Sequence, residues 1–70
     1  MDLKQIAEFL KAEREKQGLL PFHMRSETNL HSDTITAIES GETGYNIKAL
    51  LAYCKRLNYE IQIIPSDLPF

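Results

Sequence analysis

Residues that end helices recur at short intervals along this chain, and their spacing limits the folds open to it. Gly18, Asn29, Gly41 and Asn58 each follow a run of apolar residues at helical spacing. Glycine and asparagine accept the left-handed backbone with which helices often end. The stretches between them hold helices of about four turns at most. The spacing therefore predicts an all-α fold of short helices joined by tight turns.

Four helices follow from this division of the chain. Pro21 suits the first turn of a helix, because its missing N–H would have no partner there. Asn46 is a favourable N-cap residue for the apolar segment that follows it. The helices are expected from about residue 3 to 17, from 21 to 28, from 31 or 32 to 41, and from 47 to 58.

Apolar stripes indicate which faces of the first and last helices are buried. Phe9 and Tyr53 stand beside these stripes and are expected to be partly exposed, either as packing at the rim of the core or as a docking surface for a partner protein. The stripe of the first helix comprises Leu3, Ile6, Ala7, Leu10 and Arg14, and that of the last helix comprises Ile47, Leu50, Leu51, Cys54 and Leu57.

The C-terminal sequence YEIQIIP is β-branched and alternates, which predicts a short strand over residues 59–65, followed by a tail at 66–70. A single strand leaves its backbone groups unpaired. A second copy can supply the missing strand, as a two-stranded antiparallel ribbon across a twofold axis. This homodimer would also add buried area, which a chain of 70 residues lacks. The dimer contacts are expected at Tyr59, Ile61, Ile63 and Ile64.

Several classes of protein have little support in the sequence. No apolar run is long enough to span a bilayer, and the N-terminus lacks the apolar core of a signal peptide, so a soluble cytoplasmic protein is expected, with no membrane partner. No phosphate-binding glycine loop or nucleophile motif is present, so neither an enzyme nor a cofactor is expected. No metal site is expected, because compact ligand spacing is missing among His23, His31, Asp33 and Cys54.

The order of these features resembles that of a known family. Leu10 and Arg14 in the first helix, Met24 in the second, Leu30 after the turn, and the sequences TITAIESG and NIKALLAYCKRL fall at matching positions. From Ile6 to about residue 64 the chain thus resembles the lambda-repressor-like helix-turn-helix regulators, the Cro/C1 or XRE family. The ending LNYEIQIIP resembles the strand extension of HipB-like antitoxins, which dimerise through a β-ribbon.

The resemblance implies a bundle of four to five helices and places the functional residues. Residues 1–58 would form the DNA-binding domain, with the helix-turn-helix motif at 21–40 and the third helix in the major groove. Arg14 and Glu39 would form a partly buried ion pair that fixes the third helix against the first. The DNA-contacting residues of the third helix would be His31, Ser32, Asp33, Thr36, Ala37 and Ser40. Because Pro21 has no N–H to donate, phosphate contacts would come from elsewhere, with Arg25 and His23 as candidates and a plain surface role as the alternative for Arg25.

The function expected from this resemblance is a sequence-specific transcriptional regulator, a repressor that binds a double-stranded operator as a homodimer. Three departures keep an alternative open. Residues 21–44 sum to a charge of −3, Pro21 stands where the family has glutamine, and Arg25 stands where it has a small residue. The alternative is an antitoxin-like interaction module that holds a toxin protein and binds DNA weakly or not at all.

Overall fold

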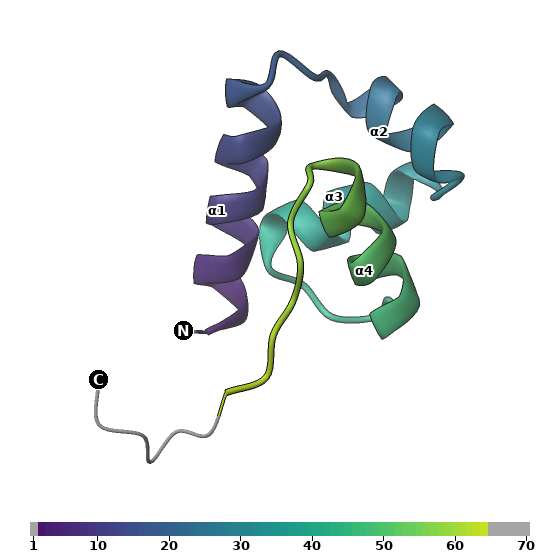
Figure 1. Ribbon diagram of the computed structural model, residues 1–70. Coiled ribbons are helices and arrows are strands. Elements are labelled where there is room, and N and C mark those ends of the chain that lie inside the picture. Colours follow the sequence, from purple (N-terminus) through teal and green to yellow (C-terminus); the bar gives the residue numbers. More distant parts are fainter. Residues whose placement is uncertain (1, 65–70) are drawn as a thin grey trace.

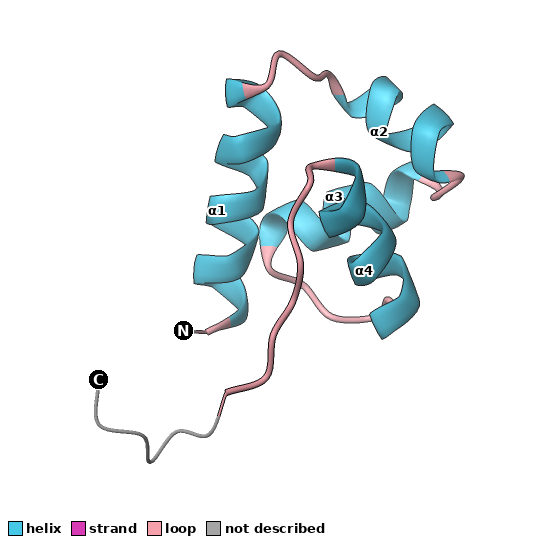
Figure 2. Cartoon of the chain, viewed as in Figure 1, coloured by secondary structure: helices cyan, strands magenta, loops and turns pink. Residues whose placement is uncertain are grey.

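The structure, a computed structural model, describes residues 2–64, and within them it contains four helices and no strand (Figures 1 and 2). The all-α class predicted from the spacing of helix-ending residues is therefore confirmed. The observed bounds differ from the expected ones by at most two residues, and those of α2 are the same. The helices are α1 (Leu3–Lys16), α2 (Pro21–Thr28), α3 (Ser32–Ser40) and α4 (Ile47–Arg56).

Local sequence accounts for where each helix begins. The Asp2 carboxylate accepts from the backbone N–H of Gln5 at 2.8 Å, while the Gln5 amide oxygen accepts from the N–H of Asp2 at 2.9 Å. This reciprocal capping box satisfies two N–H groups that α1 itself cannot. Pro21 occupies the first turn of α2, and the Asn46 side chain accepts from the N–H of Ala49 at 2.8 Å to begin α4.

Helix α3 lies at the centre of the fold and packs against α1, α2 and α4, while α2 also packs against α4. Its buried residues Ile35 and Ile38 join side chains from the three other helices in one core. This arrangement leaves α3 with one inward face and one outward face. The buried members of the core are Leu10, Met24, Ile35, Ile38, Tyr53, Cys54 and Leu57.

Gly41, at the end of α3, has both a left-handed backbone conformation and a close neighbour in α1. Its φ of +76° lies in the left-handed region, and a Cβ added there would stand 3.0 Å from the Cα of Lys4. A side chain at this position would therefore require the backbone of α1 to move away by a few tenths of an ångström. Gly18, with φ +74°, has open space around it and meets only the conformational requirement. Gly41 thus sets how closely α1 and α3 approach.

The buried face of α4 differs from the expected one. Tyr53 is fully buried, whereas Ile47 and Leu51 are 65% and 47% exposed, so the prediction of an exposed Tyr53 and of a buried Ile47 and Leu51 is wrong. Helix α4 carries apolar residues around most of its circumference, and helical spacing alone does not say which side faces the core. The buried residues are Ala49, Tyr53 and Cys54 within α4, and Leu57 directly after it.

The segment 59–64 leaves the helices as extended chain and passes between α1 and α4 in Figure 1. The expected strand is not present in these residues of the single chain, where no second strand is available to pair with them; Pro65 and the tail 66–70 lie outside the described residues. The ring of Tyr59 packs edge-on against Phe9 of α1, with ring centres 5.3 Å apart. Gln17 Nε2 also donates to the carbonyl of Leu57 at 3.1 Å, which fixes where the segment begins.

An apolar groove of about 330 Å³ lies beside this segment, between α1 and α4. Phe9, Ile47 and Ile61 line it and are each at least two-fifths exposed. Ile63, farther along, is 97% exposed and Ile64 is 53% exposed. The single chain therefore leaves several large apolar side chains exposed in the groove and along segment 59–64, which is typical of an interaction surface.

Candidate nucleic-acid interface

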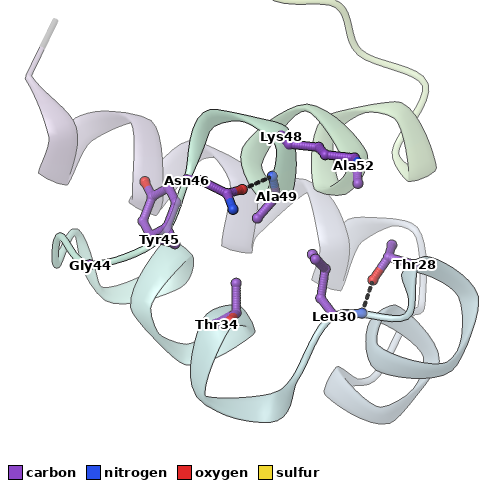
Figure 3. Close-up of a pocket in the computed structure, with 9 residues that line it drawn as sticks. All are labelled: Thr28, Leu30, Thr34, Gly44, Tyr45, Asn46, Lys48, Ala49 and Ala52. Atoms are coloured by element: carbon purple, nitrogen blue, oxygen red, sulfur yellow. Dashed lines mark hydrogen bonds between the residues drawn. The ribbon is translucent and has the colours of Figure 1, made fainter.

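Helices α2 and α3 are joined by a tight turn over residues 29–31. Asn29 takes the left-handed conformation expected of it, with φ +61°. The N–H of Leu30 donates to the Thr28 hydroxyl at 3.2 Å, and the Leu30 side chain is half-buried against the core (Figure 3). The next residue, His31, caps α3, because its Nδ1 accepts from the N–H of Asp33 at 3.1 Å. These contacts fix the angle at which α3 leaves the turn.

The two faces of α3 differ sharply in burial and chemistry. Ile35 and Ile38 are buried, as their apolar spacing predicted. The side chains of His31 and Asp33 are 74% and 94% exposed. The six residues expected at a DNA contact therefore share one outward surface, which we call the outer face of α3: exposed His31, Ser32, Asp33, Thr36 and Ser40, and half-buried Ala37.

A buried polar cluster holds the inner side of α3. Arg14 Nε and Nη2 donate to the two carboxylate oxygens of Glu39, at 2.7 and 3.2 Å, in the contact that the resemblance to helix-turn-helix regulators implied. Arg14 Nη1 also donates to the carbonyl of Leu19, at 2.6 Å, and so ties down the connection between α1 and α2. The Tyr53 hydroxyl donates to Glu39 from α4. One guanidinium and one carboxylate thereby join α1, α3, α4 and the first connection.

Tyr53 is the member of this cluster that the sequence analysis missed. A tyrosine on the core side of a helix needs a partner for its hydroxyl. It stands one turn before the buried Leu57. That spacing was the available signal, but the stripe through Leu50 and Leu51 was equally regular. The Glu39 carboxylate on α3, whose side chain is 10% exposed, favours the face with Tyr53, because it accepts a hydrogen bond from the Tyr53 hydroxyl.

Burial, together with the hydrogen bond to Glu39, raises the pKa of Tyr53 well above its ordinary value of about 10. Burial likewise raises the pKa of the Cys54 thiol. The pKa of Tyr53 is lower in the unfolded chain than in the folded chain. At pH values between these two pKa values the unfolded chain has released the Tyr53 proton and the folded chain has kept it, so the free energy of unfolding falls as pH rises. The contribution of Tyr53 is therefore fully present below about pH 10 and lost above it.

Tyr53→Phe is expected to reduce the loss of stability at high pH. Above pH 10 the free energy of unfolding of the wild type should fall more steeply than that of the variant, by about 1.4 kcal/mol per pH unit. The variant should be less stable at neutral pH, because Glu39 loses a hydrogen-bond donor. Urea unfolding followed by circular dichroism between pH 7 and 11 measures both effects. Equal slopes for the two proteins would contradict the raised pKa of Tyr53.

Ion pairs in the structure reduce the negative charge of the region around α3. Glu39 is paired with Arg14, and Glu27 is paired with Arg56 of α4, whose Nε lies 2.5 Å from the carboxylate. Both arginines come from outside residues 21–44. Counting the two pairs brings the sum for this region from −3 to −1. The fold therefore reduces the net negative charge of residues 21–44, and the acidic side chains that remain without an arginine partner are Asp33 on the outer face of α3 and Glu42 after it.

The two expected phosphate contacts lie in different settings. Arg25 is exposed on α2 and does not force α2 and α3 apart, because these helices remain packed together. His23 is half-buried, and its Nδ1 accepts from the N–H of Leu20 at 2.9 Å, which makes it a cap for α2. The ring of His23 also packs on Phe22, with centres 4.1 Å apart. Arg25 is therefore the freer of the two to reach a phosphate.

A scan against models of known protein families finds none that matches this chain, and a search of curated proteins finds no match either. The geometry of the site must therefore carry the functional conclusion.

An open pocket of about 360 Å³ lies between the turn and α4 (Figure 3). Thr34 and Leu30 line one side of it, and Asn46 and Lys48 come from the start of α4. Lys48 is exposed and stands in the first turn of α4. This places a positive charge and a helix N-terminus beside α3 at its border with α4, where an anion is favoured.

Other kinds of site find no support in residues 2–64. This part of the chain holds no group of three or more His, Cys, Asp or Glu side chains placed to bind a metal ion. None of the helices described here has the length and apolar character needed to cross a membrane.

Proposed function

We propose that this protein is a sequence-specific DNA-binding transcriptional regulator, a repressor in which α3 enters the major groove of an operator. The observation that carries this proposal is the two-sided character of α3. Its inner side is held by Arg14 and Tyr53 through Glu39, while its outer face presents exposed polar side chains. A rigid helix with a free polar face is what groove reading requires. The resemblance to lambda-repressor-like regulators supports the same function.

The proposed regulator acts as a homodimer. Few cations stand near the outer face of α3, so each subunit makes few phosphate contacts and binds DNA weakly by itself. Two subunits double the number of contacts and read two half-sites. The exposed apolar side chains of segment 59–64 and the adjoining groove support a dimer, in which the segments of two chains pair as a ribbon. The ribbon would satisfy the backbone groups that the single chain leaves unpaired.

The proposal is tested by titrating the protein against duplex DNA from upstream of its own gene, in low and moderate salt. Sequence-selective binding is expected, with a shallow salt dependence because few phosphates are contacted. The double variant Ser32→Ala with Thr36→Ala should weaken this binding about tenfold, since it removes two hydroxyls from the outer face.

The matched control is Glu8→Ala with Lys11→Ala, which removes two exposed side chains of opposite charge from α1. It should bind as the wild type does. Equal affinities of the wild type and the Ser32/Thr36 variant would mean that α3 does not read bases. Binding that fails even in low salt would overturn the DNA-binding function.

A second candidate function is an antitoxin-like module that holds a toxin protein. One observation favours it: Leu20 and Phe22, on either side of Pro21 at the start of α2, are 55% and 52% exposed. Apolar side chains are poor neighbours for phosphate but good ones for a protein surface. The same titration separates the two functions, because a module that only holds a protein shows no sequence-selective DNA binding.

A further inference from the structure

Two of the three hydroxyl groups on the outer face of α3, those of Thr36 and Ser40, direct their protons into the chain. Thr36 Oγ1 donates to the carbonyl of Ser32 at 3.0 Å. Ser40 Oγ donates to the carbonyl of Thr36, with the Glu42 carboxylate as a second acceptor at 3.4 Å. A hydroxyl has one proton and two lone pairs. With the proton used inside the chain, Thr36 and Ser40 offer only lone pairs to a molecule that lies against this face.

Asp33 adds a stronger hydrogen-bond acceptor to the outer face of α3. Its carboxylate is 94% exposed and has no proton to donate when ionised. Asp33, Thr36 and Ser40 are spaced i, i+3 and i+7, which places them in one row along the helix. The row spans about 10 Å at 1.5 Å per residue, or about three base-pair steps of 3.4 Å.

The N-terminal end of the row has the opposite polarity. Nδ1 of His31 accepts from the N–H of Asp33, so in the neutral ring the proton is on Nε2. Nε2 is then a donor, on a ring whose other nitrogen lies 3.7 Å from the carboxylate of Asp33. The row of Asp33, Thr36 and Ser40 therefore presents acceptors to a bound molecule, and His31 presents a donor at its N-terminal end. A base-pair edge can match this order of donor and acceptors in one orientation only.

From this polarity we infer that the outer face of α3 selects base pairs by their exocyclic amino groups, with the Asp33 carboxylate accepting from N4 of cytosine. In the major groove the amino groups of cytosine and adenine are donors, whereas guanine and thymine present acceptors. Guanine or thymine opposite Asp33 would place lone pairs against a carboxylate. The inference rests on the proposed DNA-binding function and names the bases that this function reads.

The experiment is selection of binding sites from a pool of random-sequence duplexes with the full chain, as wild type and as Asp33→Asn. The wild type should enrich a half-site with cytosine at one fixed position. The variant replaces one acceptor oxygen with a donor amide, and asparagine pairs in bidentate fashion with adenine. Its preference should move to adenine at that position alone, with a change in relative affinity of about tenfold.

Glu8→Gln is the matched control, because it removes one exposed carboxylate from α1 at the same change in net charge. It should leave the selected sequence unchanged, and circular dichroism should show both variants folded. On the wild-type site, replacing the cytosine with 2-pyrimidinone, which lacks the amino group, should weaken binding about tenfold for the wild type.

The outcomes separate this inference from the function on which it rests. If the wild type enriches a motif that Asp33→Asn leaves unchanged, or one without cytosine or adenine opposite the row, the amino-group inference is overturned and DNA binding stands. If the wild type enriches no sequence at all, both are overturned. A motif that shifts at one position in Asp33→Asn but not in Glu8→Gln supports the inference.

Discussion

Arg14→Met is expected to lower the free energy of unfolding by about 3 to 5 kcal/mol. The methionine removes the guanidinium but leaves the Glu39 carboxylate, whose side chain is only 10% exposed, with a single donor from Tyr53. A buried charge without its partner costs far more than the pair itself contributes. A chain of this size has a total stability of about 4 to 10 kcal/mol, so the variant should lose a large share of its stability.

The control for this prediction is the double variant Arg14→Met with Glu39→Gln. The second substitution removes the charge of Glu39, and the new amide oxygen can still accept from the Tyr53 hydroxyl, so most of the lost stability should return. Urea unfolding followed by circular dichroism measures the wild type and both variants. If the double variant is no more stable than Arg14→Met, the loss comes from packing and not from the uncompensated carboxylate.

Ile63→Asp is expected to convert the proposed dimer to a monomer and to abolish the operator binding proposed for it. Ile63 is 97% exposed in the single chain, so its replacement does not disturb the monomer core. In the proposed ribbon the aspartate would be buried against the second chain, where an unpaired charge costs several kcal/mol. The dimer dissociation constant should rise by at least about 100-fold, since each 1.4 kcal/mol is a factor of ten.

Light scattering gives the molar mass of the variant, and circular dichroism gives its helix content, which should be unchanged. The matched control is Leu20→Asp, another exposed apolar residue, but at the start of α2, where aspartate is a favourable N-cap. That variant should remain dimeric. A dimer that persists in Ile63→Asp would refute the ribbon, even if operator binding were lost.

Much of the fold was predictable because local chemistry sets the ends of short helices. Pro21, Asn29, Gly41 and Asn46 each take the role that their side chains or backbone favour. The capping box of α1 was missed, although aspartate followed three residues later by glutamine is a recognised signal. Helix boundaries therefore follow from a few residues at known positions, without reference to the rest of the chain.

The buried side of α4 was not predictable in the same way. Its sequence supports one stripe through Leu50 and Leu51 and another through Ala49 and Tyr53. The choice depends on a buried carboxylate from α3 and on a groove that α1 and segment 59–64 complete. These are contacts between distant parts of the chain, and periodicity within one helix does not contain them.

For the candidate site, the sequence was sufficient to place residues on the outer face but not to describe their hydrogen bonding. Thr36 and Ser40 are able to donate or accept as free side chains. Only the positions of the Ser32 and Thr36 carbonyls in α3 show that both protons are directed inward. The charge of the region also changed in the folded chain, because Arg56 reaches Glu27 across 29 positions of sequence.

The exposed segment 59–64 has a consequence for how such a regulator would respond to its own abundance. A chain that completes its strand only on meeting a second copy binds an operator in proportion to dimer and not to total protein. Below the dimer dissociation constant, doubling the amount of protein would raise the amount of dimer about fourfold by mass action. The amount of dimer on the operator would thus depend on the square of the protein concentration, which is set by the rates at which the cell makes and degrades the protein.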